Sequence, residues 1–129
     1  MNAGLALAVF VGAGLGGVLR WQVGALVARW LGASFPWGTL IVNVSGSAVM
    51  GVLAALFMTR TDEGLWQTAR LFMLTGVLGG YTTFSTFSLE TIALWERGAF
   101  TAAAAYCFGS VVLSFAGLWI GLVVARSFS

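Results

Sequence analysis

The residues best suited to unusual chemistry form one run inside the third uncharged block of the sequence. The run reads Gly79-Gly80-Tyr81-Thr82-Thr83. Glycine costs about 1 kcal/mol in a helix interior and threonine somewhat less, so the run predicts an unwound turn. Backbone carbonyls freed at membrane depth can hold a bare cation, and the N-terminus of a half-helix favours an anion. The alternative is a kink whose backbone groups are satisfied by serine and threonine hydroxyls.

Two phenylalanines follow this turn. Phe84 and Phe87 are three residues apart, which places them on one face of a helix. Aromatic rings carry a positive edge, so two ring edges in a pore would help to stabilise a partly dehydrated small anion. Ordinary packing of the two rings is the alternative.

Neutral hydrogen-bond donors recur on two other apolar segments. Tyr106, Ser110 and Ser114 follow one another at intervals of four, which predicts a stripe of hydroxyls on one helix face. Asn43 lies in an otherwise apolar run, with two serines nearby. Hydroxyl and amide donors suit an anion better than a cation. The alternative is hydrogen bonding between helices, which contributes roughly 0.6 kcal/mol on average.

Two charged residues border these polar groups. Arg20 follows the first apolar block, where it either extends to the membrane interface or concentrates anions at a pore mouth. Glu90 lies three residues beyond Phe87 and would be costly in hydrocarbon without partners. We therefore expect Glu90 near the end of its helix, with hydrogen-bond donors around it.

The missing residue types exclude most catalytic chemistry. The chain has no histidine, no lysine and a single cysteine, Cys107, which rules out the common triads, Schiff-base catalysis and an internal disulfide. Its four carboxylates show no spacing typical of hydrolases. The net charge of +2 comes from scattered arginines, which argues against binding to nucleic acid. The sequence therefore predicts a protein that is not an enzyme.

Composition indicates where these groups must lie. Hydrophobic residues make up 60% of the 129 residues and charged residues only 8%, too few to cover a soluble domain. Charges separate four long uncharged blocks, each close to the roughly 20 apolar residues that a span requires. We expect an all-α membrane protein with one domain over residues 1–129, a turn at Asp62-Glu63-Gly64, and transmembrane helices at approximately 3–28, 37–58, 67–95 and 99–126.

Two further patterns concern packing and orientation. Gly12 and Gly16 form a GxxxG motif, which serves packing within the chain at least as well as dimerisation. With four spans, three arginines fall on each side of the membrane. The positive-inside rule then gives no direction, which indicates either dual topology or a noisy count from short loops.

The run from Gly79 to Ser88, followed by Glu90-Thr91, resembles the signature of the CrcB/Fluc family of fluoride channels. Trp37-Gly38-Thr39-Leu40 with Asn43 and Gly46 is similar to the second-helix motif of that family, and Leu19-Arg20-Trp21 to its first. The third-helix motif is long and specific, and the resemblance covers essentially the whole chain. Tyr81 stands where the family pattern has leucine, but main-chain contacts at that point would tolerate the change.

The resemblance implies an antiparallel, dual-topology homodimer with two fluoride pathways along the subunit interface. It also implies a structural sodium ion at the dimer centre, held by the main-chain carbonyls of Gly79 and Thr82 from both chains. The implied pathway residues are Asn43, Phe84, Phe87, Tyr106, Ser110 and Ser114, and Arg20 would lie near a vestibule. On this interpretation the even split of arginines reflects dual topology.

The function expected from these features is selective, passive export of fluoride across the inner membrane of a bacterium. Hydrogen fluoride enters by diffusion and dissociates, so the anion can leave down its gradient. One alternative is a small dual-topology drug/proton exporter, which typically needs a carboxylate in its first helix; residues 1–19 contain none. Another alternative is an assembly subunit of a larger membrane complex.

Overall fold

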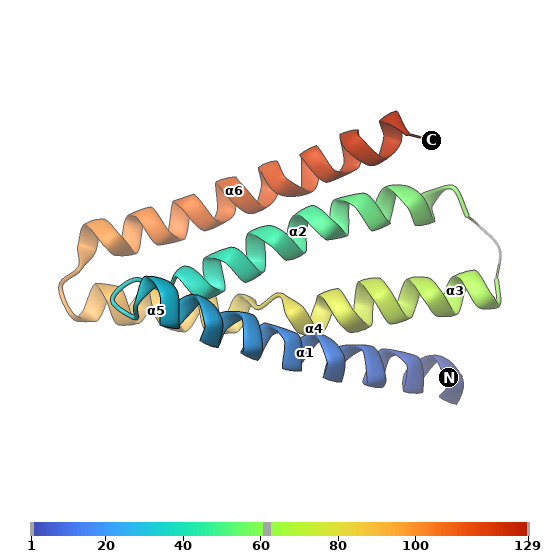
Figure 1. Cartoon of the computed structure of the whole chain (residues 1–129), viewed down its shortest axis with the longest axis horizontal. Coiled ribbons are helices and arrows are strands. Elements are labelled where there is room, and N and C mark those ends of the chain that lie inside the picture. The colour runs from blue at the N-terminus through green and yellow to red at the C-terminus, as the bar shows by residue number, and fades with distance from the viewer. Residues whose placement is uncertain (1, 61–62, 129) are drawn as a thin grey trace.

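The computed structural model describes residues 2–60 and 63–128, and helices make up almost all of this part of the chain (Figure 1). The helices run up and down along one common axis, and both ends of the chain lie at the same end of the molecule (Figure 1). The elements are α1 (Ala3–Leu31), α2 (Trp37–Met58), α3 (Leu65–Arg70), the π-helix η1 (Leu71–Leu78), α4 (Gly79–Tyr81), α5 (Phe84–Glu96) and α6 (Phe100–Ser127).

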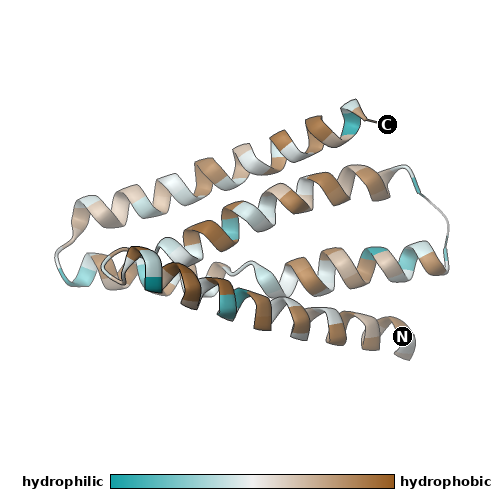
Figure 2. Cartoon of the chain, in the orientation of Figure 1, coloured by the Kyte–Doolittle hydropathy of each residue, from teal (hydrophilic) through white to brown (hydrophobic). Residues whose placement is uncertain are grey.

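Three of these helices, α1, α2 and α6, are long and apolar enough to cross a membrane. Hydrophobic residues predominate along them, as their brown colour in Figure 2 shows. The fourth long segment, residues 65–96, runs beside them but is divided into shorter elements. Four helical segments therefore fit the expected layout, with α1 continuing to Leu31 instead of ending at residue 28.

Local sequence explains where the helices begin and end. The side chain of Asn2 accepts hydrogen bonds from the amides of the first turn of α1. Gly32 and Gly98, which follow α1 and α5, adopt positive φ angles of 82° and 83°, a conformation that favours glycine. Pro36 directly precedes α2. The turn expected at Asp62-Glu63-Gly64 falls partly outside the described residues, because Asp62 is not among them.

Small residues bring α1 against the third segment. A Cβ atom on Gly12 would lie 2.6 Å from the carbonyl oxygen of Phe72, and one on Gly16 would collide with the carbonyl of Val77. By contrast, a Cβ on Gly14 would meet no atom within 4 Å. The GxxxG motif therefore packs within the chain, the first of the two roles that its sequence allowed.

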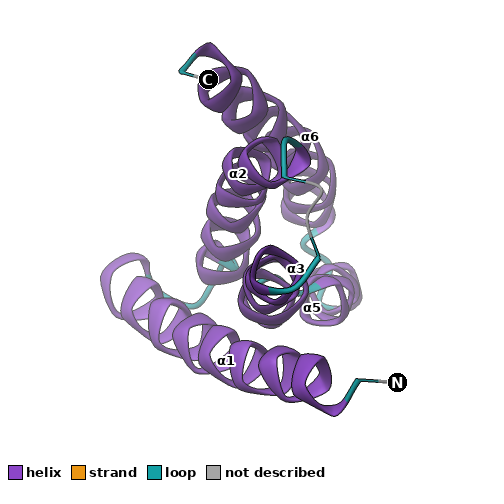
Figure 3. Cartoon of the chain, turned by 90° about the vertical axis from the view of Figure 1, so that its right-hand side faces the viewer, coloured by secondary structure: helices purple, strands orange, loops and turns teal. Residues whose placement is uncertain are grey.

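A second close pair is formed by α2 and α6, which cross beside each other on the other side of the molecule (Figure 3). Gly51 of α2 lies against the backbone of Leu118, and Gly121 of α6 lies against that of Ala48. Backbones can approach this closely only where side chains are absent. The third segment lies between this pair and α1, in contact with both.

The stretch Leu71–Leu78 forms a π-helix, which sequence analysis did not predict. π-helices are rare and concentrate near functional sites. This one ends immediately before Gly79, where the polar run begins. It also presents Gly76 to Gly12 of α1, with a Cβ on Gly76 only 3.1 Å from the Gly12 Cα.

Candidate functional site

The third segment leaves the helical conformation at two residues. Helix α4 ends at Tyr81, and α5 begins at Phe84. Between them, Thr82 has φ −78° and ψ 157°, and Thr83 has φ −149° and ψ 120°, both extended. Backbone groups around Thr82 and Thr83 therefore need partners other than those of a continuous helix.

Asn43 of α2 forms hydrogen bonds with both backbone groups of Thr83, the amide and the carbonyl. Its Oδ1 accepts the Thr83 amide at 2.8 Å, and its Nδ2 donates to the Thr83 carbonyl at 3.0 Å. In a continuous helix, the Thr83 amide would donate to the carbonyl of Gly79. Because the Thr83 amide donates to Asn43 instead, the Gly79 carbonyl is left without its usual helical donor.

The side chain of Thr83 in turn accepts a hydrogen bond from the backbone at the start of α5. Its Oγ1 accepts the amide of Thr86 at 3.2 Å and so caps the N-terminus of α5. In a continuous helix, that amide would pair with the carbonyl of Thr82. The two carbonyls that have lost their usual helical donors to side chains are therefore those of Gly79 and Thr82.

Arg20 of α1 supports the same region from the other side. Its Nε donates to the carbonyl oxygen of Gly80 at 3.2 Å. In a continuous helix, this carbonyl would pair with the amide of Phe84, which lies beyond the extended residues. Arg20 lies inside α1, well before its end at Leu31, and is partly buried. Five arginines therefore flank the spans, three at one end and two at the other, which is still close to even.

A groove of about 350 Å³ lies beside the extended residues, between α2, α5 and α6. It brings together five of the six residues expected along a pathway. Phe87 is 8% exposed and Phe84 is 78% exposed, with their ring centroids 5.6 Å apart. The residues that line it are Asn43, Gly46, Ser47, Met50, Thr82, Thr83, Phe84, Phe87, Ser110, Val111, Ser114, Phe115 and Leu118.

The hydroxyl of Ser110 is the unusual atom in this groove. Ser110 is only 4% exposed, and its Oγ has no hydrogen-bond partner within residues 2–60 and 63–128. A buried donor left without a partner costs about 1–3 kcal/mol, so native structures rarely keep one without a reason. The wall of the groove therefore contains a buried hydroxyl without a partner among the described residues.

The sixth expected residue, Tyr106, does not line the groove. It is fully buried, its ring centroid is 5.3 Å from that of Phe87, and its hydroxyl donates to Oε1 of Glu90 at 3.3 Å. Thr39 donates to the same carboxylate oxygen at 2.5 Å. The expectation that Glu90 has hydrogen-bond donors is confirmed. Sequence analysis named Thr39 only as part of the second-helix motif and did not predict its bond to Glu90, because the two residues lie 51 positions apart.

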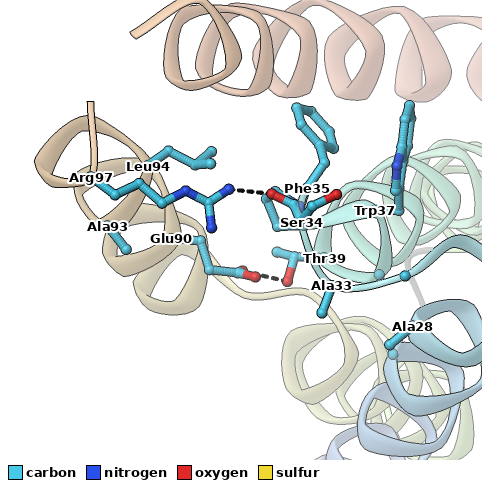
Figure 4. Close-up of a pocket in the computed structure, with 14 residues that line it drawn as sticks. Ala28, Ala33, Ser34, Phe35, Trp37, Thr39, Glu90, Ala93, Leu94 and Arg97 are labelled. Carbon is cyan, nitrogen blue, oxygen red and sulfur yellow. Dashed lines mark hydrogen bonds between the residues drawn. The ribbon is translucent and has the colours of Figure 1, made fainter. Parts of the chain in front are cut away.

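A second cavity, of about 310 Å³, lies at the end of the molecule where α1 meets α2 and α5 meets α6. Figure 4 shows the residues that line this cavity: Glu90 is hydrogen-bonded to Thr39, and Arg97 reaches the backbone of Ser34. The Arg97 guanidinium donates to the Ser34 carbonyl and ties the connection after α1 to the end of α5. Glu90 thus lines the cavity and also accepts a hydrogen bond from the buried Tyr106.

Together these features form a site without a charged side chain in the groove itself. Hydroxyls of serine and threonine and the Asn43 amide are its polar side-chain groups, and aromatic and aliphatic side chains line the rest. Such donors bind an anion weakly enough for it to leave again. Among the described residues, no group of three or more histidine, cysteine and acidic side chains is placed to hold a metal ion.

Residues 7–122 match the family described as CrcB-like protein, Camphor Resistance (CrcB). A protein named fluoride-specific ion channel FluC from Methylobacterium nodulans is 57% identical over 122 residues, covering 95% of this chain and 96% of that protein. A protein of the same name from Nitrobacter winogradskyi is 52% identical over 120 residues, covering 93% and 94%. Another, from Rhodospirillum centenum, is 50% identical over 124 residues, covering 94% of each.

Proposed function

The chain belongs to the CrcB family and is a fluoride-specific ion channel of a bacterial inner membrane, and we propose here how its residues carry the ion. It is a channel and not an enzyme. Fluoride is its substrate, and the lipid bilayer is its surroundings.

We propose that fluoride passes along the groove lined by Phe84, Phe87, Ser110 and Ser114. The observation that carries this proposal is the buried Ser110 hydroxyl without a partner. An anion in the groove would accept the hydrogen bond that this hydroxyl lacks, so the donor would be in place before the anion binds. The ring edges of the two phenylalanines would add weak positive potential beside the ion. Tyr106 would act from behind Phe87 by fixing the position of that ring.

A second copy of the chain would close the groove. Phe84 is 78% exposed and Phe115, which also lines the groove, is 75% exposed, so one side of the groove is open in a single chain. Lipid tails offer no hydrogen bonds and cannot form the wall of an ion pathway. The near-even distribution of arginines at the two ends supports an antiparallel arrangement of the two copies. Such a homodimer would contain two equivalent pathways.

A structural sodium ion would lie at the centre of that dimer. Its ligands would be the carbonyls of Gly79 and Thr82 from each chain, the two whose helical donors have been taken by Asn43 and Thr83. Carbonyl oxygens are suitable ligands for a dehydrated cation of this kind. The ion would supply a fixed positive charge between the pathways. Arg20, bonded to the intervening Gly80, would add a second positive charge near the same place.

Transport would be passive export. None of the residues lining the groove is acidic, and the sequence of α1 has no carboxylate, so no proton-coupling group lies where a drug/proton exporter needs one. Fluoride accumulated by dissociation of hydrogen fluoride would leave down its own gradient.

Purified protein reconstituted into liposomes tests this function directly. With potassium fluoride inside and valinomycin to balance charge, a fluoride electrode should record rapid release, and a chloride electrode no release from matched potassium chloride vesicles. Equal release of both anions would refute selectivity, and no release from properly folded protein would refute the channel. In the same assay, Phe84→Ile and Phe87→Ile should each reduce flux; unchanged flux in both would remove the rings from the mechanism.

A further inference from the structure

The serines of the two long helices α2 and α6 fall into two groups. Ser45 and Ser127 each donate to a backbone carbonyl of their own helix, at 3.2 Å and 2.6 Å. Within the described part of the chain, Ser47, Ser110 and Ser114 make no such bond. These three hydroxyls are the ones that line the groove.

A serine inside a helix usually satisfies its hydroxyl on the carbonyl one turn back. Ser47, Ser110 and Ser114 forgo that bond where they face the groove, and for Ser110 the cost is evident because the hydroxyl is buried. Ser110 and Ser114 belong to α6, and Ser47 lies on α2, the helix packed beside it. The groove therefore has free hydroxyls on two of its walls.

On the α2 wall, Ser47 lies one turn after Asn43, and Met50 follows on the same face. The side-chain carbonyl of Asn43 and one of its amide hydrogens are already bonded to Thr83. The Ser47 hydroxyl is uncommitted, so it is the side chain of α2 that is free to turn fully toward an ion.

We propose that Ser47 is an anion-binding residue of the fluoride pathway, donating its hydroxyl hydrogen to the anion opposite Ser110 and Ser114. This inference rests on the proposed function of the groove. Donors from two helices would surround a small anion from both sides, whereas donors from α6 alone would leave half of its lost hydration shell unreplaced.

The test compares Ser47→Ala with Ser47→Thr in fluoride flux measured from liposomes over a range of fluoride concentrations. Ser47→Ala removes the hydroxyl, and Ser47→Thr keeps it and adds a methyl group at a site that is only partly buried. We expect Ser47→Ala to raise the half-saturating fluoride concentration about tenfold, the loss expected for one hydrogen bond to a charged group, and Ser47→Thr to restore it.

Ser127→Ala is the matched control, because it removes a serine hydroxyl at the exposed end of α6, away from the groove. It should leave the half-saturating concentration unchanged. A merely structural role for Ser47 would lower the maximal flux or the yield of folded protein without shifting half-saturation. If the unsubstituted protein conducts fluoride and Ser47→Ala has the same half-saturation, the assignment of Ser47 is wrong. If the unsubstituted protein conducts no fluoride, the proposed pathway itself fails, and the role of Ser47 fails with it.

Discussion

Replacing Asn43 by leucine should destabilise the protein more than any loss of packing at that position would explain. Leucine is similar in size but cannot bond to Thr83, whose side chain and backbone are 9% exposed. Both the amide and the carbonyl of Thr83 would lose partners that now lie at 2.8 Å and 3.0 Å. A buried backbone group left unpaired costs about 1–3 kcal/mol, so the two together cost about 2–6 kcal/mol. We expect the free energy of unfolding to fall by that amount.

Asn43→Asp refines this prediction. Aspartate keeps an acceptor for the Thr83 amide but turns an oxygen toward the Thr83 carbonyl, so one hydrogen bond survives and the other becomes a repulsion. Reversible unfolding in mixed micelles of a mild detergent and dodecyl sulfate would measure both variants. Thr59→Ala, at the exposed end of α2, is the control and should unfold like the unsubstituted protein. An Asn43→Leu variant within about 0.5 kcal/mol of the unsubstituted protein would refute the role of Asn43 in holding the extended residues.

Three further perturbations have defined outcomes. Arg20→Leu removes the donor to Gly80 and should lower the free energy of unfolding by about 1.5–3 kcal/mol in the same assay; no change would show that the bond is unimportant. Gly16→Ala should lower the melting temperature, because overpacking between α1 and η1 costs typically 1–3 kcal/mol, whereas Gly14→Ala should leave it unchanged or raise it; equal effects would contradict the packing described. Replacing sodium by a large organic cation during purification should shift the protein from dimer to monomer in light scattering, and a dimer indifferent to sodium would argue against the carbonyl site.

The helices were predictable because their signals are local. The second apolar block contains no charged residue, and Pro36 directly precedes it, so α2 has the bounds expected from sequence, 37–58. The π-helix at Leu71–Leu78 was not predictable, because that stretch is apolar on all sides and gives no periodicity that separates π from α.

Spacing predicted only part of the site. Tyr106, Ser110 and Ser114 share a helix face, but the larger side chain of Tyr106 extends to Glu90 while the two serines line the groove. The pairing of Asn43 with Thr83 joins residues 40 positions apart, so no local pattern indicates it. Sequence identified Asn43 as a costly polar residue in a span, and the fold shows which backbone groups it satisfies.

Fluoride efflux from liposomes containing Ser110→Ala tests the central claim most directly. The substitution removes a buried hydroxyl that has no partner in the described structure, so the protein should be as stable as before or slightly more stable. If that hydroxyl binds the permeating anion, fluoride efflux falls by about tenfold while folding is preserved. Efflux equal to that of the unsubstituted protein would contradict a pathway built on this groove.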